Sequence, residues 1–430
     1  MRRTNASCAA ARLFAAAVVC ACAALTLAGC RKGKSGQFVP RYGKDRQDSV
    51  YIAGHYTNFE ALEAEFDRFK EYYPSVELRY EGLDNYNASI IPAVRGEDPP
   101  DIYFTFIWML DKPAYRPLFE DAENLAQPQL EFDLDCIQKG SVIQGKESGR
   151  VLMLPIVSNS YGMLVNEDLF KKHGLKIPRD YESLKQTIGK LRDLGFSSPV
   201  IGEVNGESGV FTALAIPYFC SLASGDSGVV EKLNGMGPDA APYVRDLLDF
   251  VGDFLLTGAV DLDACAPLKS GNDIIFRFFE GDIPMVFCVG DVVSSTKKRE
   301  RSSEPFMKAP FSYRFYPIPT DRGRIFLKNS SLELSVNRNS RNLEMANEFM
   351  RFLICPSELD NLAQQKRLMT VTTDYLADDI YSAFGEADVS INYDNLGLMD
   401  NTMTQMRRAV NAVAKGKLSR DEAVAAFGSF

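Results

Sequence analysis

Val50-Tyr51-Ile52-Ala53 is a short apolar run that is predicted to form a strand, and it opens the stretch of sequence that decides the fold. A helix is predicted directly after it, because apolar residues recur on one helical stripe until Pro74 ends the pattern. Thr57 and Glu60 have the spacing of a capping box at the start of this helix. Next come a predicted strand at residues 76–78, a helix near 90–94 and a strand at 102–104. This order of elements predicts an α/β sheet.

The alternation continues through the rest of the chain without an internal repeat. His173 and Gly174 are predicted to close a helix, with the glycine as a left-handed cap and the histidine in a structural role at the helix end. Ser419 and Glu422 form a second predicted capping box near the C-terminus. The remaining predicted strands lie at 151–154, 199–201, 283–287 and 325–327. The remaining predicted helices lie at 167–172, 184–194 and 244–256, and an extended segment is predicted at 315–319.

The N-terminus predicts export. The apolar run from Leu13 to Leu27 follows three arginines and is too short to span a bilayer, so it is typical of a secretory signal core. Leu27-Ala28-Gly29-Cys30 resembles the lipobox of bacterial lipoproteins, which implies that Cys30 becomes the lipid-bearing amino terminus. An ordinary signal peptide with a chance cysteine is the alternative. We therefore expect a signal peptide at 1–29 and a flexible tether at 30–48.

The net charge, the apolar runs and the cysteine spacing bear on three questions: nucleic-acid binding, membrane spans and disulfide pairing. The formal net charge is −9, and it becomes about −12 when residues 1–29 are removed, so nucleic acid is not an expected partner. No further apolar run is long enough to cross a membrane. The cysteines beyond Cys30 are widely spaced and odd in number, and we expect buried thiols, with one bridged pair left open: Cys136, Cys220, Cys265, Cys288 and Cys355.

Catalytic motifs are sparse. The chain has two histidines, His55 and His173, which leaves at most one plausible imidazole base and no histidine-rich metal site. G-x-S-x-G, H-E-x-x-H and phosphate-binding loop motifs are absent. Acidic pairs such as Asp261 with Asp263 are more typical of helix ends. We therefore predict a binding protein without enzymatic activity, cofactor or metal.

Six short motifs occur in order along the chain: residues 66–76, Pro100-Asp101-Ile102-Tyr103-Phe104, residues 154–156 with 165–175, Phe279-Glu280-Gly281-Asp282-Ile283-Pro284-Met285, residues 346–353 and residues 416–423. Together they resemble motifs of the sugar-type extracellular solute-binding lipoproteins of ABC importers. The resemblance extends from about Ser49 to Phe430. Tryptophans that this family often carries are replaced here, for example by Gly54 and Val292. This weakens the case for a long oligosaccharide as ligand and leaves room for a monosaccharide, a glycerol phosphodiester or another polar solute.

The resemblance implies an α/β periplasmic-binding-protein fold of two lobes with the ligand cleft between them. The expected N-terminal lobe is 49–157 plus 317–355, and the expected C-terminal lobe is 158–316 plus 356–430. We expect the protein to face the periplasm or the cell exterior, where it captures a small polar solute, most simply a carbohydrate, by hinge closure. It would then deliver this solute to an ABC permease. A lipoprotein sensor subunit or surface adhesin with the same fold is the alternative hypothesis. An enzyme is the third and least supported hypothesis.

Most candidate ligand-binding residues follow predicted strand ends or lie at the first crossing between the lobes, which is expected near residues 157–158, and Phe211 lies in the expected C-terminal lobe. Clefts at domain junctions and at the carboxyl ends of strands are where α/β proteins bind small molecules. Aromatic rings can stack on a sugar ring, while carboxylate and amide groups take its hydroxyls. For each of them, loop packing or a satisfied core position is an equally good interpretation. The candidates are His55, Tyr56, Thr57, Thr105, Trp108, Ser158, Asn159, Tyr161, Phe211, Asp291 and Asn329.

Overall fold

A parallel core of three strands organises the first sheet of the computed structural model. Strand β1 (Ser49–Gly54) pairs in parallel with β2 (Glu77–Gly82) and with β3 (Ile102–Thr105), and Val50, Ile52 and Ala53 of β1 are buried. The sheet has the order β11-β10-β3-β1-β2. Its other strands are β10 (Gly323–Val336), β11 (Val389–Asn392), β4 (Leu154–Asn159) and β9 (Pro319–Thr320), the last two paired with β10.

The second sheet has the order β6-β7-β5-β8. Strand β5 pairs antiparallel with both β7 and β8, while β6 pairs in parallel with β7. Every residue of β7 is buried, as expected for a strand covered on both faces. Helix α7 (Val210–Ala223) packs on β5 and β7 and is buried almost all round. The strands are β5 (Tyr161–Asn166), β6 (Val200–Ile201), β7 (Met285–Val289) and β8 (Tyr313–Tyr316).

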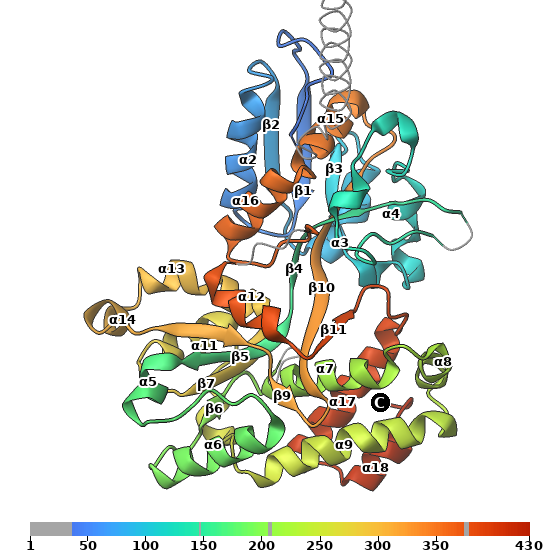
Figure 1. The fold of residues 1–430 in the computed structure, drawn as a ribbon. Helices are drawn as coiled ribbons and strands as arrows, with labels where there is room; N and C mark the ends of the chain where they lie inside the picture. The colour runs from blue at the N-terminus through green and yellow to red at the C-terminus, as the bar shows by residue number, and fades with distance from the viewer. Residues whose placement is uncertain (1–36, 146–147, 205–208, 374–377) are drawn as a thin grey trace, which may run out of the picture. The chain divides into compact units, whose positions relative to one another are not determined.

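Helices cover both sheets (Figure 1). Those associated with the first sheet are α2 (Glu60–Lys70), α3 (Tyr86–Val94), α4 (Arg116–Glu120), α15 (Leu343–Leu353) and α16 (Pro356–Lys366). The others are α5 (Glu167–Lys172), α6 (Tyr181–Asp193), α8 (Ser227–Gly235), α9 (Ala241–Leu256), α10 (Leu262–Cys265), α11 (Gly271–Phe278), α12 (Gly290–Ser294), α13 (Thr296–Glu300), α14 (Glu304–Lys308), α17 (Asp400–Ala414) and α18 (Arg420–Ala426).

The structure describes residues 37–145, 148–204, 209–373 and 378–430. Cys30 and the predicted signal segment lie outside these residues. Among the helices in the described ranges, none combines the length and apolar character needed to cross a membrane.

Several helix-end predictions are confirmed. His173 is the C-cap of α5, its ring meets Phe196 edge-on, and Gly174 has a φ of 63° in the left-handed region. Ser419 caps α18, and the reciprocal bonds with Glu422 complete the predicted capping box.

Two predictions at element ends are wrong. Helix α2 begins at Glu60 after Phe59, and no side chain caps it, so the predicted role of Thr57 is not observed. Phe59 is 1% exposed and packs edge-on against Tyr80 and Phe104, and this aromatic packing determines where the chain enters the helix. The strand expected at 151–154 begins instead at Leu154, because its pairing with β10 starts there.

Strand β10 is the longest strand of the described chain, and its two halves have different partners. Its C-terminal half pairs with β3 and β4, whereas Ile325 to Lys328 pair with β11. Strand β4 ends at Asn159 and β5 begins at Tyr161, so the chain passes from the first sheet to the second at Ser160. The first and second sheets are therefore joined through a few extended segments.

Candidate functional site

Aromatic side chains follow two parallel strands of the first sheet. His55 and Tyr56 come directly after β1, and Phe106 follows β3. The His55 ring lies 4.0 Å from the Tyr56 ring and 5.4 Å from the Phe106 ring, measured between centroids. His55 is exposed, and the other two rings are half-buried. Because carboxyl ends of parallel strands meet at one edge of a sheet, these rings form one continuous aromatic surface.

Polar side chains gather where the chain crosses between the sheets. Asn329 of β10 donates its side-chain amide to the Asn159 oxygen of β4 at 3.0 Å. Gly290, at the end of β7, lies against Asn159, and a Cβ added there would meet the Asn159 Cβ at 2.9 Å. Glycine is needed for this close approach. Asp291 is therefore held beside Asn159.

Lys366, the last residue of α16, links the aromatic and polar groups. Its Nζ lies 4.0 Å from the centroid of the Tyr56 ring, as in a cation–π contact. Its charge partly offsets the burial that raises the pKa of Asp291. Among the described residues, no carboxylate lies within ion-pair distance of Lys366. We call His55, Tyr56, Asn159, Asp291, Asn329 and Lys366 the candidate site.

The candidate site combines exposed and buried side chains, because His55 and Asp291 are exposed whereas Asn159 is 2% exposed. Asp291 and His55 are exposed by solvent accessibility, yet desolvation raises the pKa of Asp291 and lowers that of His55 to about 4. The same effect lowers the pKa of Lys366. Burial by the neighbouring protein disfavours the charged form of each of these groups. His55 is therefore neutral at pH 7 and offers a hydrogen-bonding ring there, not a cation.

Two acidic residues beside this surface were missed by the sequence analysis. Asp394 accepts hydrogen bonds from the amide and hydroxyl of Ser330, and burial raises the pKa of Asp394 to about 6. Glu333 is 1% exposed, and burial raises its pKa well above the usual range. The Ile107 amide donates to the Glu333 carboxyl, which holds the loop after β3. Asp394 follows a strand end, but β11 was not predicted, so that signal was lost.

Other predicted site residues lie elsewhere. Phe211 is 1% exposed in the core on α7. Thr105 is buried with its hydroxyl 2.9 Å from that of Ser335, and Ser158 is buried and donates to the Thr370 carbonyl at 3.1 Å. Thr57 is exposed next to Tyr56, and Tyr161 is half-buried at the start of β5.

Trp108 is packed by its own loop. Its ring stacks on Phe106 with an interplanar angle of 11°, and Tyr115 meets it edge-on with centroids 5.3 Å apart. Lys112 Nζ lies over the indole, 4.4 Å from the centroid. The aromatic surface that begins at His55 therefore continues through Phe106 to Trp108, where a lysine covers it.

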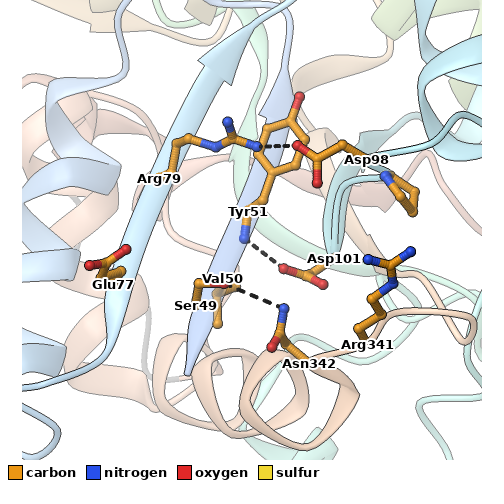
Figure 2. A pocket seen from close by; sticks show the side chains of 10 residues that line it. Ser49, Val50, Tyr51, Glu77, Arg79, Asp98, Asp101, Arg341 and Asn342 are labelled. Atoms are coloured by element: carbon orange, nitrogen blue, oxygen red, sulfur yellow. Dashed lines mark hydrogen bonds and ion pairs between the residues drawn. The ribbon is translucent and has the colours of Figure 1, made fainter. Parts of the chain in front are cut away.

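A cavity of about 350 Å³ lies at the opposite, amino-terminal ends of β1 and β2 (Figure 2). Its polar groups largely satisfy one another. Arg79 stacks on Tyr51 and pairs with Asp98 at 3.0 Å, while Asp101 accepts from the Tyr51 amide at 2.7 Å. Few groups remain for a ligand, so this cavity is a weaker candidate than the surface around Asp291.

The described residues show no cluster of three or more histidine, cysteine or acidic side chains that could hold a metal ion. All five cysteines that the structure describes are free thiols, and burial raises the pKa of each. Such thiols are packing residues with little reactivity.

Two α/β sheets joined by extended crossings define a two-lobed fold of the periplasmic-binding-protein type. The family model described as "Bacterial extracellular solute-binding protein" matches residues 53–357, and the chain belongs to this family. A search of curated protein sequences found no match.

Solved structures with this fold are similar along nearly their whole length. RafE in complex with raffinose has 15% identity and a TM-score of 0.67, covering 88% of this chain and 98% of that one. MalE, a sugar-binding protein from Xanthomonas citri, has 16% identity and a TM-score of 0.66, covering 88% and 95%. A sugar transporter from Bacillus licheniformis, in complex with stachyose, has 17% identity and a TM-score of 0.61, covering 88% and 97%.

Proposed function

We propose that this extracellular solute-binding protein captures a carbohydrate at the candidate site and delivers it to an ABC permease. The observation that carries the proposal is the juxtaposition of the His55, Tyr56 and Phe106 rings with the Asn159 and Asn329 amides. Rings supply stacking for the apolar face of a sugar, and amides pair with its hydroxyls. The solved neighbours that bind raffinose and stachyose support the same class of ligand.

The charges of the candidate site favour a neutral ligand over an anionic one. Lys366 and Asp291 carry opposite charges, and Asp394 lies nearby as a second acid. Burying an anionic ligand next to two carboxylates is costly unless it is paired with cations, and Lys366 is the one cation that we place in the site. We therefore propose a neutral mono- or oligosaccharide as the ligand, bound without catalysis.

A panel of pure solutes tests this function directly. The protein without residues 1–30 is melted with neutral sugars, including raffinose and stachyose, with uronic acids, and with amino acids. A ligand at about 100 times its dissociation constant should add roughly 2.7 kcal/mol to the free energy of unfolding. The same ligand should lower the radius of gyration in solution, because hinge closure is the motion of two-lobed binding proteins. If no solute raises the melting temperature, the result favours the alternative function as a sensor subunit or a surface adhesin.

We further infer that the protein is lipid-anchored through Cys30 and faces the periplasm or the cell exterior. Leu27-Ala28-Gly29-Cys30 after a short apolar run supports this. Metabolic labelling with a palmitate analogue should label the parent and leave Cys30→Ala unlabelled. Equal labelling of both proteins would contradict the inference of a lipid anchor at Cys30. Cys20→Ala, within the apolar run, is the matched control and should keep the label.

A further inference from the structure

A side chain of the protein itself covers the single tryptophan. Lys112 Nζ lies 4.4 Å from the centroid of the Trp108 ring, and the neighbouring rings of Phe106 and Tyr115 pack on the same indole. Trp108 is only half-buried, so its remaining surface is what a ligand could use. An ammonium over an aromatic face is an attractive contact that a stacking ligand has to replace.

An acid from the far end of the chain holds Lys112 in this position. Asp400 Oδ2 lies 3.2 Å from Lys112 Nζ. Asp400 is the first residue of α17, which packs on α7 and α9, whereas Lys112 belongs to the loop after β3. The side chains are 44% and 25% exposed, so salt can weaken the pair. This ion pair joins the Trp108 loop to helices packed around the second sheet.

We propose that Lys112, held by Asp400, determines specificity by covering the stacking face of Trp108. The inference rests on the proposed function, because a stacking ligand must displace the ammonium from the indole. Displacing the ammonium weakens the binding of ligands that stack on Trp108. It does not affect the binding of ligands that contact only Asp291 and Asn159. The ion pair therefore lowers the affinity for sugars that reach the loop after β3.

The unliganded protein tests the covered indole without any ligand. Trp108 is the single tryptophan, so intrinsic fluorescence reports on it alone. Acrylamide, which is uncharged, should quench Lys112→Ala more strongly than the parent, and Asp400→Asn should give an intermediate increase. Raising the salt concentration should increase quenching of the parent and leave Lys112→Ala unchanged. Equal quenching of the parent and both variants would overturn the proposal.

Lys232→Ala is the matched control. Its ammonium lies 5.8 Å from the centroid of the Tyr243 ring and not over the indole, so this variant should leave Trp108 quenching unchanged. With a sugar from the panel that changes Trp108 fluorescence, Lys112→Ala should bind about three- to tenfold more tightly. Weaker binding would overturn the proposal, since Lys112 would then contact the ligand. Should no sugar bind any variant, the proposed function fails, and the quenching result still decides whether Lys112 covers the indole.

Discussion

Asp291 shows how a single residue can be accessible and still poorly hydrated. It follows Gly290 at the end of β7, and the close approach of Gly290 to Asn159 places it beside the crossing between the sheets. Its carboxylate is exposed to solvent, yet burial by the surrounding protein raises its pKa, with partial compensation from Asn159 and Lys366. A hydrogen bond from a ligand hydroxyl would stabilise this poorly hydrated carboxylate in place of the missing water.

Asp291→Ala should therefore weaken ligand binding and leave the unliganded protein nearly as stable as the parent. A hydrogen bond to a charged group contributes about 1.5–3 kcal/mol, which corresponds to roughly a 10- to 150-fold loss of affinity. Calorimetric titration beside a melting curve separates the two quantities. Asp263→Ala, an exposed acid on α10, is the control. A variant with unchanged affinity would show that the ligand lies elsewhere.

At the scale of elements, α16 packs on α2 through a buried acidic pair. Arg68 donates to both oxygens of Glu358, at 2.5 and 2.9 Å, and Asn361 donates to Glu65. Helix α16 therefore belongs with the first sheet, although the expected lobe boundary lies just before it, after Cys355. Burial and a hydrogen bond with Glu358 raise the pKa of Glu65, whose Oε2 lies 3.4 Å from Arg68 Nε without hydrogen-bond geometry.

This pair predicts a pH-dependent stability with a definite sign. The folded protein keeps a proton on Glu65 that the unfolded chain releases above about pH 4.3, so this stability is lost as pH rises through the raised pKa. Glu65→Gln, which imitates the protonated form, should flatten the pH dependence between pH 5 and 9 and exceed the parent in stability at pH 9. One proton contributes at most about 1.4 kcal/mol per pH unit.

Urea denaturation at each pH measures the free energy of unfolding of the parent and of Glu65→Gln. Glu63→Gln, an exposed position on the same helix, should keep the slope of the parent. The opposing shift at Glu358 does not interfere: its burial is outweighed by the bonds from Arg68, which lower its pKa, so its contribution is lost at lower pH. A Glu65→Gln variant that keeps the full slope would show that the proton is held elsewhere.

At the scale of the whole molecule, the sheets are coupled by few connections. Strand β10 pairs within the first sheet along its length and reaches α7 of the second, and a single residue, Ser160, separates β4 from β5. Arg367, which ends α16 with a φ of 51°, donates to Thr296 and Glu300 at 2.9 Å each. Contacts of this kind can reorganise when the lobes close, which is the basis of the expected change in radius of gyration.

Local patterns in the sequence determined the order of strands and helices. The apolar run at residues 50–53, the left-handed Gly174 and the Ser419–Glu422 capping box act within a few residues, so they can be recognised without the fold. The capping box at Thr57 failed because burial of Phe59, a tertiary contact, determined the start of α2. The α/β class was thus predictable, and element ends were predictable only where no distant contact intervened.

The candidate site was predictable only in part. His55, Tyr56, Asn159, Asp291 and Asn329 could be named because each was expected to follow a strand end or to lie at a crossing. The strand end expected before Asn329 is not observed, because β10 continues through this residue. Lys366 and Glu333 could not be named, since nothing near them in the sequence marks them, and Asp394 could not because β11, the strand that it follows, was not predicted. Lys366 reaches Tyr56 and Asp291 only after α16 has packed on α2, and Lys112 meets Asp400 only when segments almost 300 residues apart come together. Pairing at such separations depends on packing and electrostatics in three dimensions, and these arise only in the folded chain.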